Sequence, residues 1–157
     1  MRLSSLADYA VLMMRTAATH CGGVRANAGS LGLEAGIPVP TAQKLASMLG
    51  RAGLIKATRG SGGGIKLARP AAAITLADII EAVDGPIALT ACLDADGSDC
   101  CALERPCAIR PHWIGVNTLV RDALAQVTLA HMIAAPEALP VGVYAPAARV
   151  PMLETLS

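Results

Sequence analysis

Four of the chain's five cysteines lie close together in the segment CLDADGSDCCALERPC, at positions 92–107. Cysteine thiolates bind iron–sulfur clusters and zinc, and they also act as nucleophiles or redox groups. Eight residues separate Cys92 from Cys101, and five separate Cys101 from Cys107. Structural zinc typically uses more closely spaced pairs, and thiol oxidoreductases use C-x-x-C. The spacing therefore fits zinc and thiol redox chemistry poorly, but spacing alone does not settle what the segment binds.

Not every cysteine suits a role as ligand. The adjacent side chains of Cys100 and Cys101 cannot easily point at one centre, so we expect one of the two to be spare. Cys21 lies far from the segment and is expected to be a small buried hydrophobic residue. Three thiolates then leave one cluster ligand to be supplied by another side chain.

The cysteine count also bears on the cellular compartment. An odd number of cysteines without an export signal argues against a disulfide framework and predicts a reducing cytoplasm. The first apolar run, Tyr9 to Met14, is shorter than the core of a signal peptide. No apolar run approaches the roughly 18 residues of a membrane span, so no membrane partner is expected.

Composition and charge predict a mainly helical protein that binds a polyanion. Hydrophobic residues make up 54% of the 157 residues, with no Phe, so the core must come from Ala, Leu, Val, Ile and Met on helices. Residues 1–69 hold nine basic and two acidic side chains, a net charge of +7, and the remainder carries −6. This asymmetry favours a polyanion-binding N-terminal half, although solvated faces would also produce it.

Two capping-box patterns predict helix starts. Apolar residues at steps of three and four predict a helix over 5–20, and Ser5 with Asp8 forms a capping-box pattern at its start. Thr75 with Asp78 forms the same pattern before a second apolar stripe.

Between these helices the sequence predicts a helix-turn-helix. A short helix around 30–35 should end at Gly36. A longer helix over 40–51 should have Pro40 in its first turn and should end at Gly53. Two short helices joined by a tight glycine turn are what this motif requires.

A basic hairpin follows immediately. Residues 54–57 and 65–68 are predicted strands on either side of the glycine-rich sequence TRGSGGG. Together with the preceding helices, this predicts a winged helix-turn-helix. The helix over 40–51 would enter the major groove of DNA, and the wing would bring Arg59 to the backbone or the minor groove.

The C-terminal half predicts a dimer. Apolar residues from Trp113 to Ala130 recur at helical spacing and predict one helix of about 22 residues. Such a helix would pair with the same helix of a second copy, which supplies two DNA-binding units, or it would fold back on its own domain. The predicted organisation is a winged helix-turn-helix domain (1–70), a linking helix (71–91), a cysteine cluster-binding loop (92–107), a dimerisation helix (108–134) and a flexible tail (135–157).

At this point the sequence resembles a known family, the IscR/NsrR-type bacterial winged-helix regulators, whose effector is an iron–sulfur cluster. The resemblance runs from residue 1 to about 133 and rests on MRLSSLADYAVLMM, IPVPTAQKLASMLGRAGLI, RGSGGGIKLARP, ITLADIIEAVDGPI, the cysteines and the HW pair before the long helix. Within the family, ERPCAIRPHW and VRDALAQVTLAHM are most similar to regulators of the SUF iron–sulfur assembly operon.

The resemblance implies a ligand set for a [2Fe–2S] or [4Fe–4S] cluster. The interval of five residues before Cys107 is similar to the family's spacing, which favours Cys92, Cys101 and Cys107, with Cys100 as the alternate.

The family completes the ligand set in two ways, and these match this sequence differently. One branch uses a His three residues after the last cysteine, but that position is Arg110 here. Another branch uses an Asp of the first helix from the partner subunit, which matches Asp8, although Asp8 also suits helix capping. His112 is a third option.

The resemblance also implies the DNA contacts. Thr41 and Gln43 match positions that approach bases in the family, and Gln suits adenine. The family's best-known cluster regulator has Glu where this chain has Gln43, and Ser where it has Pro38 and Pro40. The operator sequence should therefore differ from the one that regulator binds. The residues assigned to phosphates, or else to solvated charge, are Lys44, Arg51 and Lys56.

The sequence thus predicts a homodimeric, non-enzymatic regulator that binds double-stranded operator DNA. Its bound cluster would report cluster status, and it would repress iron–sulfur assembly genes when clusters suffice. Two alternatives remain at this point: a nitric-oxide-sensing repressor of the same fold, and a thiol redox or metal-carrier protein.

Overall fold

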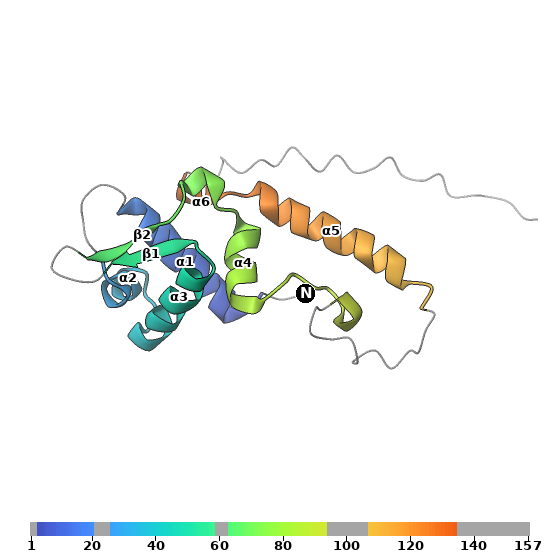
Figure 1. The fold of residues 1–157 in the computed structure, drawn as a ribbon, viewed down its shortest axis with the longest axis horizontal. Helices are drawn as coiled ribbons and strands as arrows, with labels where there is room; N and C mark the ends of the chain where they lie inside the picture. Colours follow the sequence, from blue (N-terminus) through green and yellow to red (C-terminus); the bar gives the residue numbers. More distant parts are fainter. Residues whose placement is uncertain (1–2, 21–25, 59–62, 94–106, 135–157) are drawn as a thin grey trace, which may run out of the picture.

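The computed structural model describes residues 3–20, 26–58, 63–93 and 107–134. These residues form a helical core with a two-stranded hairpin, and one helix extends away from the core (Figure 1). This confirms the prediction of a mainly helical winged helix-turn-helix with a small β-wing. The elements are α1 (Ser5–Thr19), α2 (Ala28–Glu34), α3 (Val39–Arg51), β1 (Ile55–Thr58), β2 (Gly64–Leu67), η1 (Ala71–Ala73), α4 (Leu76–Asp84), η2 (Ala91–Leu93), α5 (Arg110–Gln126) and α6 (Leu129–Ile133).

Helix α1 lies at the centre of the core and packs against α3 and α4. Its N-cap is Ser4, whose Oγ accepts a hydrogen bond from the Ala7 N–H (2.9 Å) and donates one to Asp84 Oδ1 (2.6 Å). The predicted Ser5–Asp8 capping box is therefore wrong, because Ser5 already lies within the helix. Either serine suits a cap. The hydrogen bond from Ser4 to Asp84 at the end of α4 favours Ser4.

Helices α2 and α3 form the predicted helix-turn-helix. Asn27 caps α2 by accepting a hydrogen bond from the Ser30 N–H (2.9 Å), so α2 begins earlier than predicted. Gly36 follows α2 with a φ of 70°, which favours glycine, as predicted. Pro40 lies in the first turn of α3, and Gly53 follows its end with a φ of 70°, both as predicted.

The two helices lie close together at Gly32, which is buried. A Cβ built on Gly32 would lie 2.6 Å from Ala42 Cβ on α3 and 3.1 Å from the Ile37 carbonyl oxygen. The first distance is shorter than real carbon contacts allow. The missing side chain therefore sets the separation of α2 and α3, and with it the position of the exposed face of α3.

The wing is an antiparallel hairpin in which Ile55 lies opposite Leu67. Its strands differ by one residue from the predicted limits. The Ile65 N–H donates a hydrogen bond to the Ala26 carbonyl (2.8 Å), which ties the hairpin to the chain before α2. Residues 59–62, which include Arg59, lie outside the described residues.

Helix α4 begins with the predicted capping box. Thr75 Oγ1 accepts a hydrogen bond from the Asp78 N–H (3.1 Å), and Asp78 Oδ2 accepts one from the Thr75 N–H (2.9 Å). Gly85 follows the helix with a φ of 84°. The apolar face of α4 is buried against α1 and α3, and it comprises Ala77, Ile79, Ile80 and Val83.

The predicted continuous helix over 108–134 is wrong, because the helix is interrupted between the end of α5 at Gln126 and the start of α6 at Leu129. Thr128 caps α6: its Oγ1 accepts a hydrogen bond from the His131 N–H, and its own N–H donates to His131 Nδ1 (3.1 Å). Apolar residues keep their helical spacing across this break, so the periodicity concealed it.

The break lets α6 fold back onto the core. The Val127 carbonyl accepts a hydrogen bond from the Leu76 N–H (2.8 Å), and the Leu129 N–H donates to the Ile74 carbonyl (2.8 Å). Leu129 is fully buried, whereas α5 has no buried residue. The alternative of folding back therefore applies to α6 and to the last turns of α5, where Leu124 and Ala125 pack against the core. No helix in the described ranges is long and apolar enough to cross a membrane.

Candidate functional site

One face of α3 packs into the core and the opposite face is polar. Thr41 is half-buried, and Gln43, Lys44 and Arg51 are exposed. Hydroxyl and amide groups can bond to base edges, and cationic groups can bond to phosphates. The residues that α3 buries are Ala42, Leu45 and Leu49.

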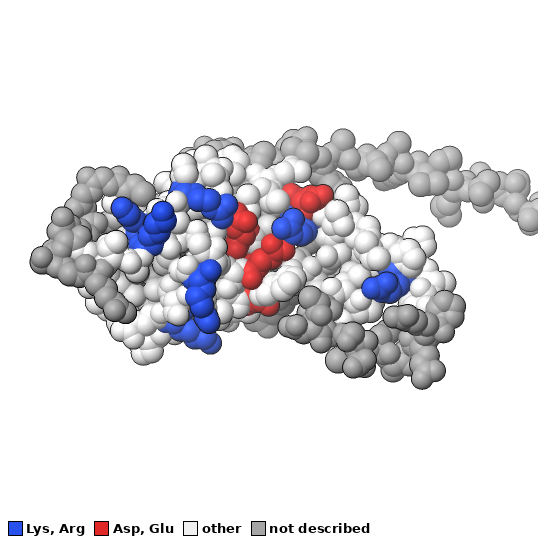
Figure 2. All heavy atoms as spheres, in the orientation of Figure 1, with Lys and Arg blue, Asp and Glu red and all other residues white. Residues whose placement is uncertain are grey.

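Basic side chains gather on the half of the molecule that contains α3 and the wing (Figure 2). Lys56 extends this surface onto β1, where it is exposed. Lys44, Arg51 and Lys56 form no salt bridge with any other described residue. Their charges are therefore available to a polyanion.

The acidic side chains of α4 are instead engaged within the protein, between the basic half and α5 (Figure 2). Asp78 lies 3.5 Å from Arg69 beyond the wing, and Asp84 accepts the hydrogen bond from the α1 cap. Glu81 accepts two hydrogen bonds from Arg121 of α5, at 2.8 and 3.1 Å. These hydrogen bonds, and then the charge of Glu81, raise the pKa of Arg121. Helix α4 thus connects the basic half to α5.

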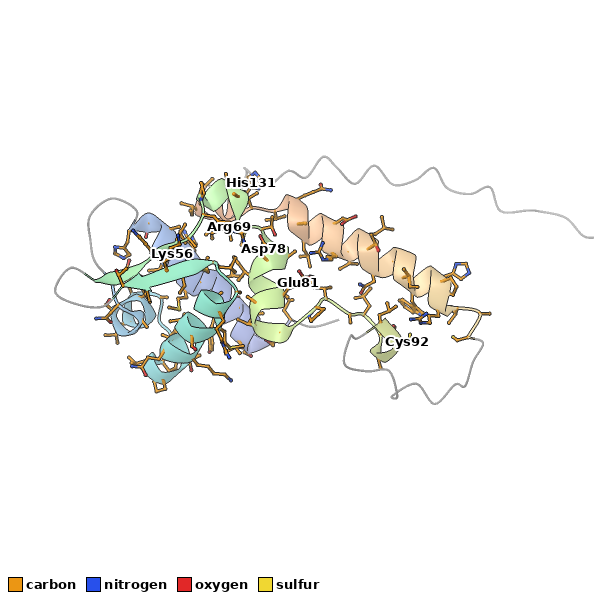
Figure 3. The ribbon with its side chains drawn as sticks, in the orientation of Figure 1. Lys56, Arg69, Asp78, Glu81, Cys92 and His131 are labelled. Atoms are coloured by element: carbon orange, nitrogen blue, oxygen red, sulfur yellow. The ribbon has the colours of Figure 1, made fainter. Side chains whose placement is uncertain are left out.

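The first candidate cluster ligand, Cys92, lies on the η2 turn (Figure 3). Its thiol is free and half-buried, and its Sγ lies 3.3 Å from Thr90 Oγ1. The η2 turn contacts α5. Cys92 is therefore held near the extending helix rather than on an unattached segment.

Cys107 lies at the other end of the cysteine segment, directly before α5. Its thiol is also free and half-buried, and its carbonyl accepts a hydrogen bond from the Arg110 N–H (3.3 Å). Cys100 and Cys101 lie outside the described residues, as does Cys21. Two thiols of the predicted set therefore lie near α5, one on η2 and one just before the helix begins. Free, half-buried thiols fit the thiolate chemistry that an iron–sulfur cluster needs.

The candidate fourth ligands are both exposed. Asp8 lies in the first turns of α1, where Ser4 does the capping, and its carboxylate accepts no hydrogen bond from a described residue. His112 lies in the first turn of α5. Within the described ranges, no three His, Cys, Asp or Glu side chains come together as a metal site.

Sequence reasoning missed two long-range contacts around the cysteines. One is the Glu81–Arg121 pair, and the other is Asn117 of α5, which bonds to the chain before η2. The indication available in the sequence was the place of Asn117 in the helical repeat, four residues after Trp113 and three before Val120, since a polar side chain on an apolar face needs a partner.

Comparisons with known proteins agree on one family. Residues 3–135 match the model of the Rrf2 family, described as iron-dependent transcriptional regulators. The regulator IscR of Erwinia tasmaniensis is 33% identical over 141 residues, which cover 90% of this chain and 84% of the relative. IscR of Vibrio cholerae is 30% identical over 141 residues, which cover 90% of this chain and 80% of the relative.

Solved structures share the fold. CymR, the global cysteine regulator of B. subtilis, has a TM-score of 0.65 at 28% identity, covering 85% of this chain and 96% of CymR. T. potens IscR has a TM-score of 0.64 at 28% identity, covering 85% of this chain and 86% of that structure. The chain therefore belongs to the Rrf2 family, and it is a winged-helix DNA-binding transcriptional regulator rather than an enzyme or a thiol-dependent carrier.

Proposed function

We propose that this regulator is a homodimeric cytoplasmic repressor that controls iron–sulfur cluster assembly genes through a bound iron–sulfur cluster. The observation that carries the proposal is the pair of free, half-buried thiols of Cys92 and Cys107, which lie near a helix joined to the DNA-binding core. The similarity to regulators named IscR supports it.

Three cysteines would hold the cluster, namely Cys92, Cys107 and Cys101, with Cys100 as the alternate for the last. Asp8 of a partner copy would supply the fourth bond, since its exposed carboxylate is not used in capping. His112 is the alternative fourth ligand. When bound, a cluster supplies a labile, redox-active centre.

Ligation at the two thiols would change how η2 and the start of α5 are held together. Arg121 would carry this change to α4 through its two hydrogen bonds to Glu81. Because α4 packs against α1 and α3, a shift of α5 would alter the position of the DNA-binding helix. Both guanidinium and carboxylate are partly exposed, so this pair serves orientation more than stability.

The dimer would form through α5. This helix, with Ile109 directly before it, leaves several large apolar side chains partly exposed, and Leu119 is 69% exposed. A second α5 would bury them and would give the paired DNA-binding helices that a two-fold operator needs. The exposed residues are Ile109, Trp113, Ile114, Val116 and Leu119.

On DNA, Thr41 and Gln43 would contact bases, while Lys44, Arg51, Lys56 and Arg59 would contact phosphates. Gln43→Ala is expected to weaken discrimination between operator variants by about 1–3 kcal/mol at the contacted base pair. Lys44→Ala should weaken binding to all sequences and reduce the salt slope by about one. Titrations at several salt concentrations would check both.

The matched control is Gln126→Ala, which removes the same side chain from the last turn of α5. It should leave both operator discrimination and the salt slope unchanged. Equal effects of Gln43→Ala on all operator variants would contradict a base contact.

The cluster is tested with single cysteine variants purified without oxygen. Cys92→Ser, Cys101→Ser and Cys107→Ser should each lose at least tenfold in cluster retention, seen as visible absorption and as bound iron and sulfide. Cys21→Ser and Cys100→Ser are the controls that should retain the cluster, and Asp8→Ala tests the fourth ligand.

Operator binding measured with and without the cluster then tests the signal. Iron chelation should change operator affinity if the protein reports cluster status. Release caused by nitric oxide but not by chelation would favour the nitric-oxide-sensing repressor instead. A wild-type protein that binds no iron and sulfide would refute both.

A further inference from the structure

The side chain of Asn117 makes a two-point contact with the chain that leads to Cys92. Its Nδ2 donates a hydrogen bond to the Ile87 carbonyl (2.8 Å), and its Oδ1 accepts one from the Leu89 N–H (3.0 Å). We call these two hydrogen bonds the Asn117 bridge. The side-chain amide thus satisfies one carbonyl and one N–H together in a short segment that belongs to no helix or strand.

The Asn117 bridge fixes the approach to Cys92. Directly after Leu89, the Leu93 N–H donates to the Thr90 carbonyl (3.0 Å) and closes the η2 turn. Thr90 Oγ1 also lies 3.3 Å from Cys92 Sγ. The thiol of Cys92 is thus held by a turn that begins one residue after the bridged segment.

Cys107, at the other end of the cysteine segment, is joined to the same helix, since its carbonyl accepts a hydrogen bond from the Arg110 N–H at the start of α5. Asn117 lies two helical turns further along α5, roughly 10 Å from that start. Both ends of the cysteine segment are therefore attached to one helix, α5. The distance between the two thiols depends on the Asn117 bridge as well as on the segment itself.

We propose that Asn117 is a positioning residue for the cluster ligands, which holds Cys92 at a set place relative to Cys107. The inference rests on the proposed function. Thiols that are already placed lose less conformational entropy on ligation, so the bridge would slow cluster loss. Asn117 does this without touching the cluster.

Three variants separate this role from a general effect on folding. Asn117→Leu keeps the branching of the side chain at Cγ and removes both hydrogen bonds. Asn117→Asp keeps the acceptor for the Leu89 N–H but loses the donor to Ile87. Thr118→Val is the control, because Thr118 is the next residue, is exposed, and bonds only to the Ile114 carbonyl of its own helix among the described residues.

The first measurement needs no cluster. In a chain where Cys92 is the single cysteine, the rate of thiol modification should rise severalfold in Asn117→Leu, rise less in Asn117→Asp, and stay unchanged in Thr118→Val. Thermal unfolding of each variant shows whether the chain is still folded. An unchanged rate in a folded Asn117→Leu variant would overturn the inference.

The second measurement uses the chain with all its cysteines, loaded with ferrous iron and sulfide without oxygen. Loss of visible absorption after adding a chelator should be about 10- to 100-fold faster in Asn117→Leu and intermediate in Asn117→Asp. If Asn117→Leu and Thr118→Val lost their visible absorption at the same rate, Asn117 would have no role in holding the cluster ligands. If the wild type takes up no cluster, the proposed function fails, and the thiol rates alone decide whether Asn117 positions Cys92.

Discussion

Gly32→Ala is expected to destabilise the protein by about 2 kcal/mol and to weaken operator binding. The added methyl group would meet Ala42 Cβ at 2.6 Å and the Ile37 carbonyl at 3.1 Å, so α2 or α3 must shift. Overpacking typically costs about 1–3 kcal/mol and sometimes more, whereas replacing a helical glycine by alanine returns only about 1 kcal/mol. The steric cost therefore dominates. Chemical denaturation and operator titration would measure the two effects.

Gly50→Ala is the matched control. Gly50 lies in α3, and a Cβ there meets nothing within 4 Å. The same substitution should therefore stabilise the protein by up to about 1 kcal/mol. A second test is Ala42→Gly in the Gly32→Ala background, which should restore the space and part of the operator affinity. If Gly32→Ala and Gly50→Ala changed the free energy of unfolding in the same direction, the close approach of α2 and α3 would be contradicted.

Leu129→Ala is expected to lower the free energy of unfolding by about 2–5 kcal/mol, the usual cost of a leucine-sized cavity. Leu129 is 0% exposed and is the side chain that α6 buries in the core. Its loss would also loosen the backbone hydrogen bond from the Leu129 N–H to the Ile74 carbonyl. Urea denaturation at a fixed protein concentration would give the change.

Leu119→Ala removes the same atoms from α5, where the side chain is 69% exposed. It should leave the stability of the single subunit nearly unchanged and should instead weaken the proposed dimer. Sedimentation velocity would separate these outcomes. If Leu119→Ala were as destabilising at all protein concentrations as Leu129→Ala, α5 would have to pack within its own subunit.

Local sequence features predicted the elements whose ends are set by neighbouring residues. Gly36 and Gly53 follow their helices with a positive φ, and the Thr75–Asp78 capping box is formed by residues three apart. These features depend on short-range sterics and hydrogen bonds, which the order of residues specifies. The predicted helix-turn-helix and wing followed from them.

Distant contacts decided the elements that the sequence did not predict. Ser4 rather than Ser5 caps α1 because Asp84 lies beside it. The break before α6 depends on Ile74 and Leu76, which bond to the backbone there. The pattern at Thr128 was present in the sequence, but His is a less usual capping partner than Glu or Gln.

For the candidate site, the sequence predicted which residue types could bind DNA or a cluster, but not how they are held. The exposure of Gln43 and Lys44 followed from the helical spacing of the apolar residues. Neither the Arg121 contact with Glu81 nor the Asn117 bridge could be predicted, because each joins residues far apart in the chain.

The chain leaves the core after Ile87 and returns to it at Leu129, where backbone hydrogen bonds join the start of α6 to Ile74 and Leu76 at the start of α4. The stretch between these two points is thus a long loop, including α5, whose two ends are both anchored in the core. Doubling the length of such a loop costs only about 0.6 kcal/mol in closure entropy. Insertions or exchanged ligands in this loop can therefore accumulate during evolution while the DNA-binding fold is retained. Solved structures of this fold include both IscR and CymR, the global cysteine regulator, and such variety is what this construction would produce.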